Sequence, residues 1–264
     1  MITQYLAAIF LVGPKENYLV YLSDIRLLFL VLGTVLIAAA GYIINDYYDI
    51  KIDLINKPEK VVVGNILKRR VAMFTHVAFS VAGILLGILV SWKVGAINAW
   101  AAFVLWLYSN KLKRLPFIGN LAVSFLTALA IALVGVYLEA NQRLVLIYAV
   151  FAFFISLIRE VIKDMEDLKG DVTFGCKTLP VIWGIRKTKL YVYTIGVILI
   201  VLLPYLSYSL YRPMLFYYFV LLLLPVFYLF YRLGQADTVK AFAFLSRLCK
   251  ILMLCGIISM VFFQ

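Results

Sequence analysis

Histidine and cysteine are scarce in this chain of 264 residues, which contains one histidine and three cysteines. His76 lies in an apolar stretch, and Cys176, Cys249 and Cys255 show neither zinc-ligand nor redox spacing. The composition therefore argues against a zinc site and against a histidine-based nucleophile relay. We expect these four side chains to have packing roles.

Charged residues are also few, because Asp, Glu, Lys and Arg make up 14% of the chain. Hydrophobic residues make up 65%, and the mean hydropathy is +1.02, whereas a soluble domain averages about 45–50% apolar residues. The apolar runs are long and continuous, unlike the roughly ten-residue alternating segments of a membrane β-barrel. We therefore predict an all-α, polytopic membrane bundle that forms a single domain over residues 1–264.

Nine apolar runs can be interpreted as membrane-spanning helices, since most approach the ~20 residues that a hydrocarbon core of ~30 Å requires. They cover residues 1–13, 25–44, 71–91, 94–108, 118–138, 144–162, 188–209, 213–233 and 242–263. The first run, at about 1.5 Å per residue, reaches only about two-thirds of the way across. It lacks a basic start and a small-residue cleavage site, so we expect an incomplete first helix rather than a signal peptide.

The positive charges are divided unequally between the two ends of these predicted spans. Of the 25 Lys and Arg residues, 20 lie in the loops that join spans 2 and 3, 4 and 5, 6 and 7, and 8 and 9. The positive-inside rule places these loops in the cytoplasm, with the bundle in the cell (plasma) membrane. Topology and attraction to anionic membrane lipid then explain the net charge of +12 without nucleic acid.

Two of these loops hold nine of the thirteen acidic residues. In each loop, three aspartates are spaced by three and then by four residues, and they are Asp46, Asp49 and Asp53 in the first loop and Asp164, Asp167 and Asp171 in the second. Such positions lie within about 60° of one another on a helix, so each triad should form an acidic stripe at a helix end. The repetition suggests two related halves around a central cavity.

Six carboxylates near one mouth of a bundle would repel one another and raise each other's pKa, and a divalent cation would remove this repulsion. An all-oxygen ligand set indicates a hard ion, Mg²⁺, with Mn²⁺ or Ca²⁺ as alternatives. Because Mg²⁺ commonly combines one or two carboxylates with substrate phosphate, we expect the stripes to cradle a diphosphate. The alternative is a pair of solvated helix ends.

Basic residues around the stripes are expected to hold the phosphate oxygens that the metal leaves free, although each one alone is also explained as a topology determinant. They are Lys57, Lys60, Lys111, Lys113, Arg159 and Lys163.

These motifs resemble those of a known family. NDYYDIKID, residues 45–53, resembles the NDxxDxxxD motif of the UbiA-type intramembrane prenyltransferases, and DLKGD, residues 167–171, resembles their DxxxD motif. The resemblance covers nearly the whole chain, and nine spans is the number typical of the family. It implies Mg²⁺-dependent transfer of a prenyl group from an isoprenoid diphosphate to a lipophilic acceptor, with Asn45 at the diphosphate.

Three longer segments resemble one branch of that family, the digeranylgeranylglyceryl phosphate synthases. They are YSNKLKRLPFIGN (108–120), REVIKDMEDLKGD (159–171) and GCKTLPVIWG (175–184). Those enzymes join geranylgeranyl diphosphate to the free hydroxyl of geranylgeranylglyceryl phosphate. The chain departs from the family pattern at Lys57, where arginine is usual. Lysine keeps the positive charge but lacks the bidentate fork of arginine. The usual arginine near the start of the first helix is also missing.

Two residues are expected to act in the reaction itself. The ring of Tyr108 would stabilise an allylic cation, with a place in the interfacial aromatic belt as the alternative. Asp171, or the diphosphate itself, would accept the proton of the acceptor hydroxyl.

Two other functions stay open at this point. An aromatic prenyltransferase that makes quinone, haem or chlorophyll precursors would use the same motifs with another acceptor. An ion-coupled membrane transporter would also carry intramembrane carboxylates in related halves. The position of the aspartates at the ends of spans, rather than near the midplane, argues against a transporter.

Overall fold

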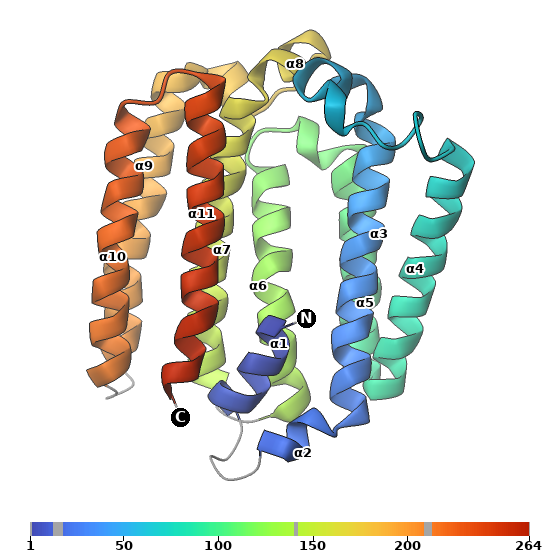
Figure 1. The fold of residues 1–264 in the computed structure, drawn as a ribbon, viewed down its shortest axis with the longest axis vertical. Coiled ribbons are helices and arrows are strands. Elements are labelled where there is room, and N and C mark those ends of the chain that lie inside the picture. The colour runs from blue at the N-terminus through green and yellow to red at the C-terminus, as the bar shows by residue number, and fades with distance from the viewer. Residues whose placement is uncertain (1, 13–17, 140–141, 209–212, 264) are drawn as a thin grey trace.

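The computed structural model describes residues 2–12, 18–139, 142–208 and 213–263, except for the side chains of residues 18, 60, 213–215 and 262–263. Its regular structure is a bundle of helices that run roughly alongside one another (Figure 1). In chain order they are α1 (Ile2–Leu6), η1 (Ala7–Val12), α2 (Tyr18–Leu22), α3 (Ile25–Asn56), η2 (Pro58–Lys60), α4 (Arg69–Val90), α5 (Trp92–Asn110), η3 (Leu112–Arg114), α6 (Ile118–Leu138), α7 (Gln142–Glu166), α8 (Leu168–Thr173), α9 (Leu179–Tyr208), α10 (Pro213–Gly234), α11 (Val239–Ser259) and η4 (Met260–Phe263).

The predicted class, an all-α membrane bundle, is confirmed, whereas the number of nine spans is not. Seven helices of the described residues are long and apolar enough to cross a membrane, namely α3, α4, α6, α7, α9, α10 and α11. The segment Ile2–Val12 is too short for this, and α5, with 19 residues, is not among the seven. Polar residues of α5 such as Lys93 and Asn98 lower its hydropathy.

Two helices extend beyond the predicted spans toward the acidic motifs. Helix α3 continues past residue 44 to Asn56 and therefore carries the whole first motif. Helix α9 begins at Leu179 instead of residue 188, but Gly184, with φ 74° and ψ 164°, interrupts it. A positive φ of this kind suits glycine, so a separate turn precedes the long part of α9.

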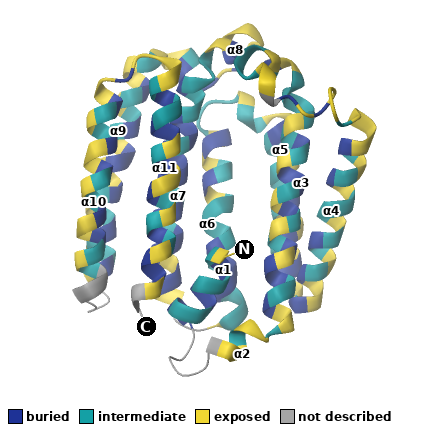
Figure 2. Cartoon of the chain, in the orientation of Figure 1, coloured by how far each residue is buried: buried dark blue, intermediate teal, exposed yellow. Residues whose placement is uncertain are grey.

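The loops rich in lysine and arginine lie at one end of the bundle, as predicted. The connections α3–α4, α5–α6, α7–α9 and α10–α11 all lie at the top of Figure 1, together with α8, while α2 lies at the opposite end. Helix α7 is the most buried span, with 72% of its most apolar window buried against 44% or less in the other six (Figure 2). It packs against α6, α9 and α11, so it positions the second acidic motif from the core.

Small residues let α3, α4 and α5 approach closely. A Cβ atom on Gly83 would lie 2.9 Å from the carbonyl oxygen of Gly33, and Asn98 Nδ2 donates to the Gly83 carbonyl over 2.9 Å. His76 Nδ1 lies 3.0 Å from the Ala40 carbonyl in the same interface. Close backbone approach and interhelical hydrogen bonds stabilise helix pairs in lipid, and the histidine has the packing role that its sequence context predicts.

Candidate active site

A cavity of about 360 Å³ gathers the acidic residues of the two motifs. Its walls include all six predicted aspartates, Asp46, Asp49, Asp53, Asp164, Asp167 and Asp171. Five other residues of the predicted site also line it, and these are Asn45, Lys57, Tyr108, Lys113 and Lys163. Segments more than 100 residues apart in the chain therefore contribute to a single site, which we call the acidic cavity.

The first aspartate triad lies on one continuous helix. Helix α3 runs without a break from Ile25 to Asn56, and Asp46, Asp49 and Asp53 all face the acidic cavity from it. The spacing of three and four residues places them on one side of the helix. The predicted helical stripe is therefore confirmed for this triad.

The second triad does not form a single helical stripe, and that prediction is wrong. Helix α7 ends at Glu166, and Asp167, with φ −91° and ψ 5°, lies between α7 and α8. The helix restarts there because the N–H groups of Gly170 and Asp171 donate to the Asp167 carbonyl, over 3.1 and 3.2 Å. Asp164 and Asp171 therefore reach the cavity from two different helices.

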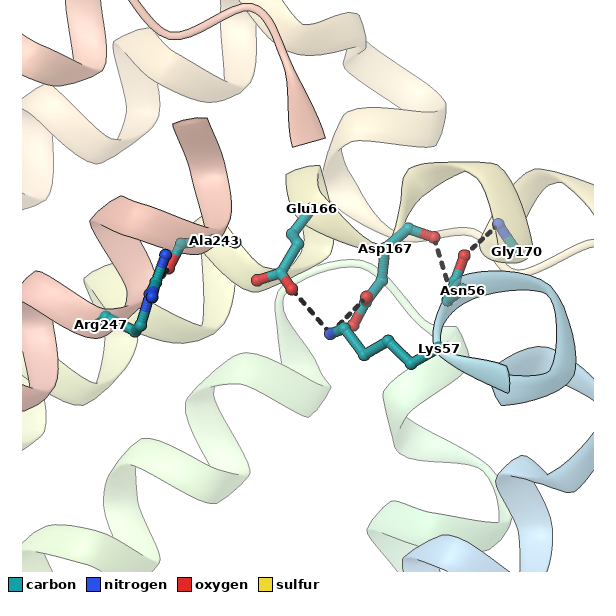
Figure 3. A network of polar contacts seen from close by, with 7 residues as sticks. All are labelled: Asn56, Lys57, Glu166, Asp167, Gly170, Ala243 and Arg247. Carbon is teal, nitrogen blue, oxygen red and sulfur yellow. Dashed lines mark hydrogen bonds and ion pairs between the residues drawn. The ribbon is translucent and has the colours of Figure 1, made fainter. Parts of the chain in front are cut away.

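Two neighbouring side chains at the end of α3 bind the turn between α7 and α8 (Figure 3). Asn56 Nδ2 donates to the Asp167 carbonyl over 3.1 Å, and Asn56 Oδ1 accepts from the Gly170 N–H over 2.9 Å. Lys57 Nζ lies 2.8 Å from Glu166 Oε1 and 2.9 Å from Asp167 Oδ1. These contacts join the C-terminal end of α3, the helix that carries the first acidic motif, to the second acidic motif.

Replacing Asn56 by Ala should lower the stability of the protein by about 1–3 kcal/mol, because the buried N–H of Gly170 would lose the shorter of its two hydrogen bonds and the Asp167 carbonyl would lose the donor Nδ2. Thermal unfolding of detergent-solubilised protein measures this as a lower melting temperature. Asn65→Ala is the control, since its side chain makes one local hydrogen bond, to the Val61 carbonyl. Equal losses in the two variants would contradict a special role for the Asn56 contacts.

The lysine of η3 is held against the first motif. Lys113 Nζ forms an ion pair with Asp49 Oδ1 and lies 3.4 Å from Asn45 Oδ1. Both charged side chains are nearly buried, with 10% and 14% of their surface exposed. Burial lowers the pKa of Lys113, although the charge of Asp49 opposes this shift. This ion pair holds the segment between α5 and α6 against α3.

Two residues that the sequence analysis missed orient the second motif. Asn120 Nδ2 donates to Asp164 Oδ2 over 2.9 Å, and Thr178 Oγ1 donates to Asp171 Oδ2 over 3.0 Å. Neither is signalled by periodicity, since Asn120 lies at the start of α6 and Thr178 follows the turn after α8. Both belong to segments with family resemblance, so that resemblance was the one available signal.

The acidic cavity has an excess of negative charge, because seven carboxylates and three lysines line it. The pKa of Asp171 is raised to about 6, chiefly by burial and also by the charges of Asp167 and Asp49, while the hydrogen bond from Thr178 opposes this shift. Among the described residues, no three carboxylates come close enough to hold a metal ion by themselves. A cation bound here would therefore need further ligands, such as phosphate oxygens.

Two residues of the predicted site lie outside the acidic cavity. Lys111 is exposed and does not line this cavity. Arg159 lines a second cavity instead. The side chain of Lys60 lies outside the part of the chain that the structure describes.

The second cavity, of about 650 Å³, adjoins the acidic cavity and is largely apolar. Side chains of α3, α5 and α6 such as Ile37, Leu105 and Leu126 form much of its wall. The two cavities share five lining residues, and these are Tyr42, Asn45, Tyr108, Glu160 and Lys163. A ligand at this border would touch polar groups on one side and hydrocarbon on the other.

Several curated relatives that share one name match large parts of this chain. A digeranylgeranylglyceryl phosphate synthase from Saccharolobus solfataricus is 35% identical over 254 residues, which cover 93% of this chain and 86% of the relative. One from Thermococcus gammatolerans is 41% identical over 149 residues, or 56% of this chain. That match spans about half of the relative's length, 54%.

Solved structures have the same fold. A structure concerned with digeranylgeranylglyceryl phosphate synthase in membranes aligns with a TM-score of 0.72 at 24% identity, covering 99% of this chain and 90% of that one. A UbiA homologue from Archaeoglobus fulgidus bound to DMAPP and Mg²⁺ aligns with a TM-score of 0.63 at 17% identity, covering 97% and 94%. Residues 3–254 match the UbiA prenyltransferase family. The chain therefore belongs to the UbiA prenyltransferase family.

Proposed function

We propose that this protein transfers the geranylgeranyl group of geranylgeranyl diphosphate to the free hydroxyl of geranylgeranylglyceryl phosphate and releases diphosphate. The observation that carries the proposal is the acidic cavity, in which two distant aspartate motifs meet beside an apolar cavity. The lysine-rich end of the bundle would face the cytoplasm from the cell membrane. The names of the relatives support the choice of acceptor.

The residues of the acidic cavity suit Mg²⁺ in the presence of a diphosphate. The donors are carboxylate oxygens, which hard cations prefer, and they are too dispersed among the described residues to enclose an ion by themselves. Mg²⁺ held by aspartates of both motifs would act as a Lewis acid on the diphosphate oxygens. UbiA homologues from Archaeoglobus fulgidus bound to DMAPP or GPP together with Mg²⁺ support this assignment. Mn²⁺ has similar ligand preferences.

The lysines of the cavity would serve the diphosphate. Lys113 and Lys57 form ion pairs with Asp49 and Asp167, and Lys163 also lines the cavity. Once a cation binds the aspartates, these ammonium groups can donate to phosphate oxygens instead. Asn45, next to Lys113 on the same wall, would donate its amide N–H to the same oxygens.

The proposed bond changes take place where the acidic cavity meets the second cavity. The C1–O bond of the donor breaks, and its electron pair leaves with the diphosphate. The ring of Tyr108 lines both cavities and would stabilise the allylic cation. The acceptor oxygen then bonds to C1, and its proton passes to Asp171 or to the diphosphate. The apolar walls exclude water that would otherwise capture the cation.

Incubating the purified protein with geranylgeranyl diphosphate, Mg²⁺ and a panel of acceptors tests this function. The expected product has the mass of digeranylgeranylglyceryl phosphate, forms with equimolar diphosphate, and is absent when EDTA removes the metal. Consumption of an aromatic acceptor instead would replace the acceptor but keep the reaction class. A transporter would release no diphosphate under any of these conditions.

A further inference from the structure

The second cavity carries a charge opposite to that of the first. Its charged residues are three cations, Arg159, Lys163 and Lys250, and one carboxylate, Glu160. The acidic cavity needs added cations before an anion can bind there, whereas this one already has an excess of positive charge. An anionic group can therefore bind in the second cavity without a metal.

Arg159 has unused hydrogen-bonding capacity in this cavity. It pairs with Glu160 through Nη1, but its buried Nε has no hydrogen-bond partner among the described residues. A buried polar group without a partner is costly, and guanidinium groups bind phosphates through more than one N–H. Arg159 lies four residues before Lys163 on α7, so it is about 6 Å, or one helical turn, farther from the acidic end.

Lys250 brings a second cation to the same cavity from α11. The remaining wall is apolar, from residues such as Ile97, Leu129 and Leu133. One anionic group beside a long apolar surface fits an amphipathic lipid with a phosphate head. The charges and the wall together specify a ligand different from the diphosphate bound by the aspartates.

We infer that Arg159 and Lys250 bind the phosphate of the acceptor lipid and thereby select a phosphorylated acceptor. This inference rests on the proposed function, which supplies the acceptor. Because glycerol is a three-carbon unit, the free hydroxyl of such a lipid lies within two carbons of its phosphate. A phosphate held by Arg159 therefore keeps the hydroxyl near Tyr108 and Asn45, at the border with the acidic cavity.

Binding measured without donor and without Mg²⁺ tests the inference separately from catalysis. The probes are geranylgeranylglyceryl phosphate and geranylgeranylglycerol, titrated into detergent-solubilised protein. Arg159→Gln should weaken binding of the phosphate lipid by at least about tenfold, and Lys250→Gln by about threefold because this lysine is exposed. Neither variant should change binding of the phosphate-free lipid. Arg159→Lys, which keeps the charge, should recover part of the affinity.

Arg247→Gln is the matched control, because it removes the same charge from α11 outside the lining of both cavities. It should bind both lipids like the wild type. Equal losses for both lipids in Arg159→Gln, together with no loss in Lys250→Gln, would overturn the inference. An equal loss of affinity for geranylgeranyl diphosphate with Mg²⁺ would also overturn it, because Arg159 would then serve the donor.

The same titrations separate this inference from the proposed function. If the wild type binds the phosphate lipid through these residues but forms no product, the proposed reaction fails and the binding site stands. If product forms while both variants bind the acceptor normally, the proposed reaction stands and the binding site fails.

Discussion

Replacing Asp49 or Asp171 by Asn should reduce kcat for prenyl transfer by about 10²–10³-fold, because each change removes one charged oxygen donor from the acidic cavity. The two residues come from different motifs, on α3 and α8. If both motifs serve one metal–diphosphate assembly, either loss should also raise the Mg²⁺ concentration needed for half-maximal rate. Steady-state rates over a Mg²⁺ titration measure both effects.

Asp237→Asn is the control for these variants. Asp237 is an acidic residue at the same end of the bundle, but its side chain is 80% exposed and pairs with Lys189 away from the cavity lining. This variant should retain the wild-type rate and Mg²⁺ dependence. Near-native activity of Asp49→Asn or Asp171→Asn at saturating Mg²⁺ would show that the residue in question is not a metal ligand.

The first aspartate motif is predictable from sequence because its geometry is local. Asp46, Asp49 and Asp53 lie on an uninterrupted helix, so residue spacing alone determines which face they share. The class of the fold is predictable for a related reason, since long apolar runs determine helices in lipid. Helix periodicity and hydropathy are properties that neighbouring residues in the chain specify together.

The second motif shows where such reasoning fails. The spacing of the aspartates is the same, but the helix is interrupted at Asp167. Asn56, 111 residues away in the chain, binds the turn at this point. Asn120 and Thr178 likewise reach their aspartates from other elements. These contacts depend on how helices pack, and a periodic pattern within one segment does not contain that information.

The sequence also does not predict which surface or cavity each lysine or arginine side chain contacts. Lys111, Lys113 and Arg159 have the same charge and lie near the same end, yet one is exposed, one lines the acidic cavity and one lines the second cavity. The positive-inside rule places all three at one face of the membrane. It does not separate topology determinants from residues that contact a substrate.

Replacing Lys113 by Met should lower kcat/KM for geranylgeranyl diphosphate by about 10²-fold, because the diphosphate would lose a nearly buried cationic donor. The same variant should bind Mg²⁺ more tightly in the absence of substrate, since Lys113 no longer competes for Asp49. These effects have opposite signs. A general loss of structure would weaken substrate binding and metal binding together, so calorimetric titration with Mg²⁺ separates the two explanations.

Lys111→Met provides the matched comparison, because Lys111 lies two residues away, carries the same charge and is exposed outside the acidic cavity. If membrane topology were the main role of both lysines, the two variants would have similar activity after correction for expression. We expect Lys111→Met to keep wild-type kinetics and metal affinity while Lys113→Met changes both. Equal kinetics in the two variants would remove Lys113 from the diphosphate site and leave the aspartates without their proposed exchangeable counter-ion.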